Sequence, residues 1–599
     1  MKDMINTTLS LFHAVERKDG GEVSLADEDT LAEGLVITSG AGWAKDRIIQ
    51  HYLRNRLDGK GLNKTFHKSW KKVASSSRLE LLVHQLVHYL TTYGTNFQSE
   101  IYIPAEILDL EGESIPVRVV KAYTREELVD KCTDLINSGV ALKQETLESV
   151  IGLMLDLGCD LKKMSGSFKN KEATVFLYTL AGIIPSDPVD ALRCIVYEAT
   201  GSTLLIKDRN TIDALKQAQD GRKIRQTLKE CGHEKMATIF NRYKPLFLAM
   251  KHLAKKDVNR ISKLSKKHHM PLVQNPLNIA THKKIMKADE HWLTNATPYA
   301  LLSALKACCA RISGQERFTY LVRNGRMWAD EAVRNYDTKV LTFNKNKIIK
   351  ELKSRIGDVS DQLVYIPDGV EYGLPTSEKS FIGNFPKGTR ITAKAVAAGV
   401  YWENAWGATD LDVSSMSVDG VKTGWNARYN DRENLIYSGD ITYAPEGAVE
   451  YIRASGIKSD QLLLNNVYSG DNQCGYRIVV GTGDRITKQM MMNPSKVVVD
   501  AKTNSIKNET ILGFFSQNGD NTSFTLVNAA GASGRVSGHN ENTQRFIASL
   551  IDECRNAVTL NDVMIMLGYR LTNVEEDATI NLSTNGLERD TLLKIFQPS

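Results

Sequence analysis

Three aspartates have the types and spacing expected of a cation site. Asp410 and Asp412 are separated by one residue in WENAWGATDLDVSSMSVDG (402–420), and Asp440 follows in YSGDITYAPEGAVEYI (437–452). Alternate residues of a strand point to one face, so a strand here would present both carboxylates to the same ion. Hard cations such as Ca²⁺ prefer carboxylate and carbonyl oxygens. The spacing therefore predicts a Ca²⁺ site formed by Asp410, Asp412 and Asp440 with loop carbonyls.

The same residues resemble the TerD-type tellurite-resistance and stress-response family. Members of that family carry an aspartate-leucine-aspartate motif, matched here by Asp410, Leu411 and Asp412. They also carry a serine-glycine-aspartate turn, matched by residues 438–440. The resemblance covers residues 375–530. It implies a β-sandwich that binds calcium or a partner, in a bacterial or phage setting of stress response or defence.

The chain departs from that family after the turn. Family members continue with an acid-rich run, whereas only Glu446 and Glu450 remain here, which removes ligands. The alternative interpretation is that the three aspartates are turn and cap residues of an ordinary sandwich. A metal-dependent adhesion motif, D-x-S-x-S, does not fit, because Ser414 and then Met416 follow Asp412.

A basic cluster is the second candidate site. The stretch KHLAKKDVNRISKLSKKHHM (251–270) spaces its lysines for one helical face, with an apolar stripe opposite. Phosphate backbones are common polyanionic partners of such a face. The alternative is a solvated helix face. The predicted nucleic-acid-binding residues are Lys251, Lys255, Lys256, Arg260, Lys263, Lys266, Lys267, Lys283, Lys284, Arg323 and Arg326.

The type of polyanion is indicated by aromatic residues beside the cations. Tyr320 and Trp328 flank Arg323 and Arg326, and aromatic rings next to cations suit single-stranded RNA or DNA. A basic helical array followed by a smaller C-terminal domain loosely resembles the TROVE (Ro-like) RNA-binding proteins. That resemblance is architectural and assigns no residue.

No catalytic pattern is recognisable in the sequence. His84 and His88 have the spacing of a zinc-binding helix, but Gln85 stands where the catalytic glutamate belongs. The apolar residues that flank both histidines favour core or interface packing. Walker A, GxSxG and GxGxxG motifs are missing, and the cysteines lack ligand spacing. We therefore expect a protein that is not an enzyme.

Charge is distributed unevenly among the elements that must position these residues. Residues 1–200 hold 23 basic and 28 acidic residues, residues 201–350 hold 30 and 12, and residues 351–599 hold 23 and 30. The net charge of +6 therefore conceals a strongly basic middle region. Eight irregularly spaced cysteines and the lack of a signal peptide or long apolar run predict a cytoplasmic protein with reduced thiols and no membrane contact.

Apolar spacing divides the chain into a helical part and a strand-rich part. Helical periodicity recurs at 75–94, 124–139, 145–158, 211–232 and 297–312. After about 360, short β-branched and aromatic runs between Gly, Asn and Asp predict an antiparallel sandwich. The expected regions are an acidic helical domain (1–200), its basic continuation (201–355), a TerD-like β-sandwich (360–541) and C-terminal helices (542–599).

Together these patterns predict a multidomain α plus β protein with an N-terminal all-α helical array. Its basic helices would engage RNA or single strands, and its sandwich would bind calcium or a partner. The alternative function is a self-assembling structural or assembly protein, possibly phage-encoded. In that case the basic middle of one subunit of a homo-oligomer would contact acidic parts of another.

Overall fold

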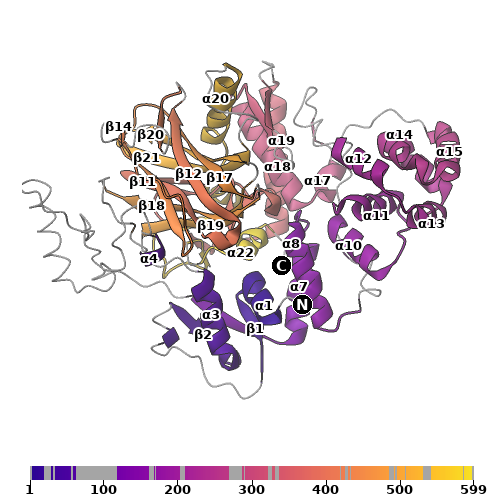
Figure 1. Cartoon of the computed structure of the whole chain (residues 1–599), viewed down its shortest axis with the longest axis horizontal. Helices are drawn as coiled ribbons and strands as arrows, with labels where there is room; N and C mark the ends of the chain where they lie inside the picture. The colour runs from indigo at the N-terminus through magenta and orange to yellow at the C-terminus, as the bar shows by residue number, and fades with distance from the viewer. Residues whose placement is uncertain are drawn as a thin grey trace, which may run out of the picture.

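The helical N-terminal half and the antiparallel β-sandwich are both present in the computed structural model, which confirms the α plus β class (Figure 1). Helices dominate up to residue 356, and the sandwich follows. The structure describes residues 3–18, 29–30, 34–55, 59–62, 118–160, 168, 170–202, 209–268, 287–288, 290–321, 327–330, 336–417, 420–424, 430–431, 434–471, 473–484, 492, 496–505, 508–530, 541–583 and 586–596.

A small parallel sheet in the N-terminal region is the main departure from the predicted all-α array. Its strand order is β1-β3-β2, with β3 parallel to both neighbours. Strands of three residues are too short to show alternation, and their partner lies far away in the sequence. The elements of this region are α1 (Met4–Phe12), β1 (Ala14–Glu16), β2 (Leu35–Ile37), η1 (Gly42–Ala44), α3 (Lys45–Asn55), α4 (Gly59–Leu62) and β3 (Arg118–Tyr123).

Most helices predicted from apolar spacing are confirmed. The patterns at 124–139, 145–158 and 297–312 correspond to α7, α8 and α18, whereas 211–232 is divided into α12 and α13. The pattern at 75–94 lies outside the described residues. The helices and the β4–β5 hairpin are α7 (Arg125–Asn137), α8 (Gln144–Asp156), α10 (Lys171–Ala181), α11 (Pro188–Thr200), α12 (Arg209–Gln217), α13 (Arg222–Glu230), α14 (His233–Ala249), η2 (Met250–His252), α15 (Lys255–Leu264), η3 (Ser265–His268), α17 (Glu290–Asn295), α18 (Pro298–Ile312), β4 (Phe318–Leu321), β5 (Met327–Asp330) and α19 (Thr338–Ile356).

Helices α11 to α15 form a unit with its own hydrophobic core. This core is made of buried side chains such as Leu192, Leu228, Phe240, Phe247 and Ile261. The unit lies at the right of Figure 1, on the far side of the molecule from the sandwich. The first part of the strongly basic region, through α15, is therefore carried by a separately packed group of helices, whereas α17 to α19 belong to the common core.

The sandwich consists of two antiparallel sheets. Their strand orders are β13-β12-β17-β20-β21-β10-β7 and β14-β15-β16-β11-β18-β19. The first sheet contains β7 (Val370–Glu371), β10 (Arg390–Ala393), β12 (Ala408–Ser417), β13 (Lys422–Gly424), β17 (Gln461–Gly470), β20 (Glu509–Asn518) and β21 (Asn521–Ala530). The second sheet contains β11 (Ala395–Trp402), β14 (Asn430–Asp431), β15 (Leu435–Tyr437), β16 (Ala448–Ala454), β18 (Gly475–Gly483) and β19 (Val497–Asn504).

Both outer faces of the sandwich are covered by other parts of the chain. Helix α20 (Glu541–Arg555) packs Ile547 and Ile551 against Leu464 of the first sheet. Leu62 of α4 packs on the second sheet, and its carbonyl accepts a hydrogen bond from the Tyr451 hydroxyl at 2.9 Å. Strand β12 is buried at every residue except Thr409.

The C-terminal tail, which we predicted as helices, also contributes strands. Strands β22 and β23 pair in parallel with β6, which precedes the sandwich. The remaining elements are β6 (Leu363–Tyr365), η4 (Glu378–Ser380), β8 (Phe381–Ile382), β9 (Phe385–Pro386), η5 (Asn404–Trp406), α21 (Leu560–Leu567), β22 (Arg570–Thr572), β23 (Ile580–Asn581) and α22 (Arg589–Lys594).

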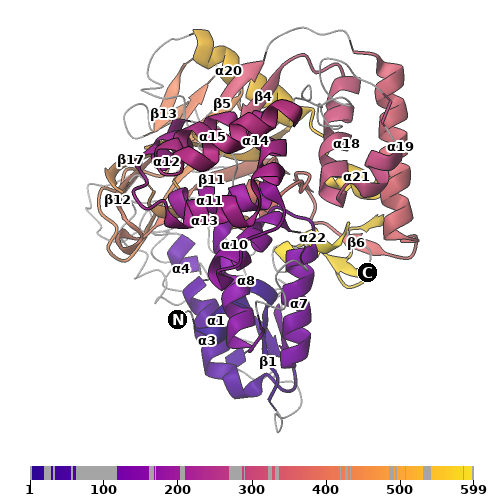
Figure 2. The same cartoon turned by 90° about the vertical axis from the view of Figure 1, so that its right-hand side faces the viewer.

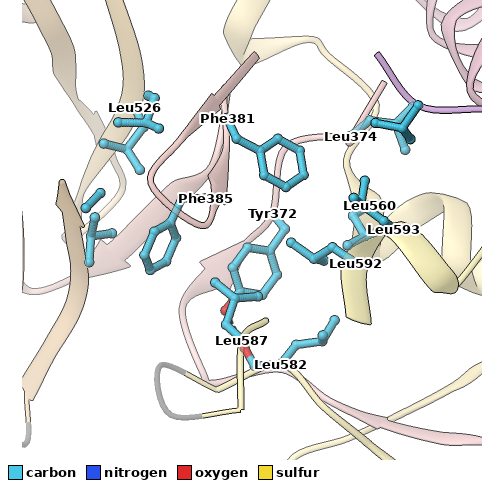
Figure 3. Packing of buried hydrophobic residues seen from close by; sticks show 14 of the residues in the cluster. Tyr372, Leu374, Phe381, Phe385, Leu526, Leu560, Leu582, Leu587, Leu592 and Leu593 are labelled. Atoms are coloured by element: carbon cyan, nitrogen blue, oxygen red, sulfur yellow. Dashed lines mark hydrogen bonds between the residues drawn. The ribbon is translucent and has the colours of Figure 1, made fainter. Parts of the chain in front are cut away.

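One hydrophobic core joins the helices, the sandwich and the tail. Figure 3 shows Tyr372 and Phe381 among leucines of α21 and α22, with Leu526 of β21 at the other side. The view in Figure 2 likewise places α22 and α21 beside the helical region. Leu592 and Leu526 are fully buried in this core. Because burial of apolar area is the main driving force of folding, the tail stabilises the whole assembly.

A buried carboxylate connects the same three parts. Glu378 is fully buried in η4 and accepts hydrogen bonds from the Lys143 backbone N–H at 2.5 Å and from the Thr146 hydroxyl at 2.8 Å. The Arg589 guanidinium of α22 donates to it at 2.8 Å. These donors compensate the cost of removing the carboxylate from water.

Replacing Leu592 with alanine should destabilise the core by about 2–5 kcal/mol, because the side chain is fully buried. Leu571, which is 38% exposed on β22, is the matched control, and its replacement should change stability little. Denaturation midpoints of both variants measure the difference. Similar midpoints would show that α22 is not part of the common core.

Candidate metal centre

The β12–β17 pairing is irregular on both sides of Asp410. The register shifts on both sides of Asp410, which pairs with Ser469, while Leu411 pairs with Val467. Such β-bulges redirect side chains next to functional sites. Asp412 follows two residues later, on the same face of the strand. The alternative interpretation as turn or cap residues is therefore wrong for Asp410 and Asp412, because both lie inside a strand.

The three predicted aspartates come together in space. Asp440 lies in the loop after β15, and one carboxylate oxygen from each of Asp410, Asp412 and Asp440 lies within 4.8 Å of the others. Oxygens that ligate one Ca²⁺ at about 2.3–2.6 Å are separated by no more than about 5 Å. The spacing of the three carboxylates thus fits a single ion.

One oxygen of each carboxylate lacks a compensating donor among the described residues. Asp410 and Asp412 are only 5% and 2% exposed. The Asp410 Oδ1, Asp412 Oδ2 and Asp440 Oδ1 atoms are buried and accept no hydrogen bond from any residue that the structure describes. Buried carboxylates without donors are destabilising unless a cation or proton neutralises them. These unpaired oxygens are the feature that fits a bound cation.

The electrostatics of the cluster agree with its geometry. Burial, with the neighbouring Asp440 carboxylate, raises the pKa of Asp410 to about 6. Burial, with Asp410 and Asp440, raises the pKa of Asp412 to about 7, although Lys422 opposes this shift. Ionisation of these carboxylates is therefore unfavourable in the absence of a cation, and a bound cation would compete with protons for the site.

Glu450 supports the site from the second sheet. It is fully buried on β16, and its Oε2 atom accepts from the Val413 N–H at 2.8 Å and the Tyr437 hydroxyl at 2.6 Å. Its Oε1 atom accepts from the Ile441 N–H at 2.8 Å. Burial raises the pKa of Glu450, and these three donors oppose the shift. The sequence assigned no role to Glu450, which stands with Glu446 in place of the acid-rich run of the TerD-type family.

Sequence reasoning missed two further charged residues beside the cluster. Glu509 on β20 and Asp412 on β12 both pair with Asn466 of the strand between them, β17. The two acidic residues therefore lie in one row across the sheet, on strands separated by β17. Burial raises the pKa of Glu509 to about 7, and Lys422 of β13 lowers it. The register of four strands, β13, β12, β17 and β20, places these residues near Asp412, and the sequence carries no local signal for it.

The structure places the predicted basic residues on separate elements. The stretch 251–268 is not one continuous helix: η2 carries Lys251, which is only partly exposed, and α15 and η3 follow. Lys283, Lys284, Arg323 and Arg326 lie outside the described residues, as do His84 and His88. We call the remaining exposed cations of α15 and η3 the α15 basic face; they are Lys255, Lys256, Arg260, Lys263, Lys266 and Lys267.

The α15 basic face has no carboxylate partner within 4.0 Å among the described residues. The acidic residue of α15, Asp257, is buried and pairs with His233 of α14 at 2.9 Å. By contrast, Arg222 and Lys223 of α13 pair with Asp220 and Glu198. The positive charge of α15 is therefore left for solvent or a partner.

Comparison of the chain with protein-family models, with curated proteins and with solved structures found no match. Within the described residues, no helix is both long enough and apolar enough to cross a membrane. The cysteines are all free thiols, as predicted.

Raising the pH should destabilise the metal-free protein. The unfolded aspartates ionise near pH 4, whereas folded Asp410 and Asp412 ionise at about 6 and 7. Stability is therefore lost as pH rises from about 4 to about 7, and the loss stops above that. The Asp412→Asn variant should be more stable than the parent by a few kcal/mol at pH 8, since each pKa unit corresponds to about 1.4 kcal/mol.

Unfolding in the presence of a chelator at pH 5 and pH 8 measures this effect. Asp520→Asn, in the exposed turn between β20 and β21, is the control and should follow the parent. The prediction is contradicted if the parent protein loses no more stability between pH 5 and pH 8 than Asp412→Asn does.

Proposed function

We propose that this chain is a cytoplasmic binding protein whose sandwich holds a divalent cation, Ca²⁺, between Asp410, Asp412 and Asp440. The observation that carries this proposal is the convergence of three carboxylates, each with a buried unpaired oxygen. Asp410 and Asp412 would hold the ion from β12, and Asp440 from the loop after β15. Bound Ca²⁺ would neutralise charge that burial otherwise makes unfavourable.

The proposed biological setting is bacterial or phage stress response and defence. The partial resemblance of 402–452 to the TerD-type family suggests it, and the β-sandwich around the aspartates supports it. Because Glu450 is engaged by three donors, the acidic run that supplies ligands in that family contributes none at this position. The proposed site would accordingly have fewer protein ligands than the site of the TerD-type family.

Calcium should raise the melting temperature of the parent protein at pH 7.5. Ligand at a hundredfold excess over Kd stabilises by about 2.7 kcal/mol. Asp410→Asn and Asp412→Asn should abolish the shift, because each removes a charged ligand. Asp520→Asn should keep it. Thermal unfolding with chelator or with added Ca²⁺ measures the shift, and a parent protein that does not respond excludes the calcium site.

A second proposed function is nucleic-acid binding through the α15 basic face. It is supported by six exposed cations that have no carboxylate partner within the part of the chain that the structure describes, and by the burial of Asp257 away from that surface. Like charges on one face repel one another unless a polyanion or salt screens them. Phosphate backbones supply regularly spaced negative charge to such surfaces, and their binding is strongly salt-dependent.

Replacing Lys256, Arg260, Lys263 and Lys267 together with glutamine should weaken binding of a labelled single-stranded RNA. It should also reduce the salt slope by about 3, since each phosphate contact contributes about 0.7 for single strands. Titrations at 50 and 200 mM salt measure both effects. Arg222 and Lys223, which are already ion-paired, supply a control double variant that should bind like the parent.

The alternative function, self-assembly through complementary charge, predicts a different effect of the same quadruple variant. The quadruple variant would then lose association with itself, seen by light scattering over a concentration series. RNA binding that is absent or indifferent to salt would exclude the nucleic-acid proposal. A parent protein that remains monomeric at every concentration would exclude the alternative.

A further inference from the structure

The carboxylate of Glu450 lies between the two backbone segments that carry the candidate ligands. Its Oε2 accepts the N–H of Val413, the residue after Asp412, and its Oε1 accepts the N–H of Ile441, the residue after Asp440. One side chain from the second sheet thus bonds both segments. Each bond is 2.8 Å long.

The contact to Val413 satisfies a backbone donor next to the β12–β13 pairing. Among the described residues, strand β13 pairs with β12 from Ser414 to Met416. Val413 directly precedes this paired stretch, and its buried N–H requires an acceptor. Glu450 supplies this acceptor, so the segment bearing Asp412 is fixed in place.

The position of Glu450 itself is closely constrained. A Cβ atom at Gly399 of β11 would lie 1.8 Å from the Glu450 carbonyl oxygen, so only glycine allows the observed approach of β11 to β16. The Tyr437 hydroxyl donates to Oε2 from β15. Because neighbours hold both its backbone and its carboxylate, Glu450 can determine the geometry of the groups it bonds.

We propose that Glu450 is a positioning residue of the cation site, setting the separation between Asp412 and Asp440 through the N–H groups of Val413 and Ile441. This inference rests on the proposed calcium function. Partners beyond the direct ligands orient them, and losing one typically weakens metal affinity about 10- to 100-fold. Glu450 is not one of the carboxylates that converge within 4.8 Å, and its oxygens accept three hydrogen bonds, so we assign it an action through the backbone and not as a ligand.

Calorimetric titration with Ca²⁺ alone tests this role in the full-length parent and in Glu450→Gln. The amide has the same size, but it places an NH₂ donor against one of the two N–H groups. We expect Kd to rise about 10- to 100-fold. Tyr437→Phe keeps both N–H bonds and should weaken binding less, and it provides a second measurement if Glu450→Gln does not fold.

Glu378→Gln is the matched control, because Glu378 is also fully buried and also accepts a backbone N–H, but its partners are Lys143, Thr146 and Arg589 and not the segments that carry the aspartates. It should lower the melting temperature of the metal-free protein and leave Kd within about twofold of the parent. A purely structural Glu450 would behave in the same way: its glutamine variant would melt earlier and retain the parent Kd, which overturns the inference. A parent that binds no Ca²⁺ overturns the proposed function and the inference together.

Discussion

Buried carboxylates constrain which parts of this chain lie together, since a carboxylate removed from water requires donors or a cation. Glu378 and Glu450 are fully buried, and each accepts hydrogen bonds from backbone N–H groups and side chains. Glu378 joins helix α8, the start of the sandwich and α22, and Glu450 joins the two sheets. One carboxylate oxygen of Asp410 and one of Asp412 are buried and have no such donor among the described residues. This difference separates carboxylates that hold the fold together from those available to a ligand.

The two candidate functions are carried by opposite parts of the molecule. The aspartate cluster lies in the sandwich, and the α15 basic face lies on helices that pack around their own core (Figure 1). The charges of that face are not neutralised by carboxylates of the sandwich among the described residues. A partner bound at α15 would therefore contact a surface separate from the cation site.

The predictions that succeeded depended on local patterns. Apolar periodicity located α7, α8 and α18, and turn-rich β-branched runs located the sandwich. Strands β1 and β2 were missed because three residues do not establish a period. The break between α12 and α13 was missed because helical spacing continues across it, although Gly221 approaches the Leu253 carbonyl too closely for a side chain.

The sequence by itself determined the alternation that puts Asp410 and Asp412 on one face, the acidic residue that follows in the turn, and the concentration of lysines around α15. It did so because these features depend on neighbouring residues. Only the tertiary structure decided that Asp440 reaches the other two carboxylates, that Glu450 bonds Val413 and Ile441, and that Glu509 joins the row of Asp412. Those contacts depend on strand register and on the packing of two sheets, which are set by the burial of the whole core rather than by any local segment.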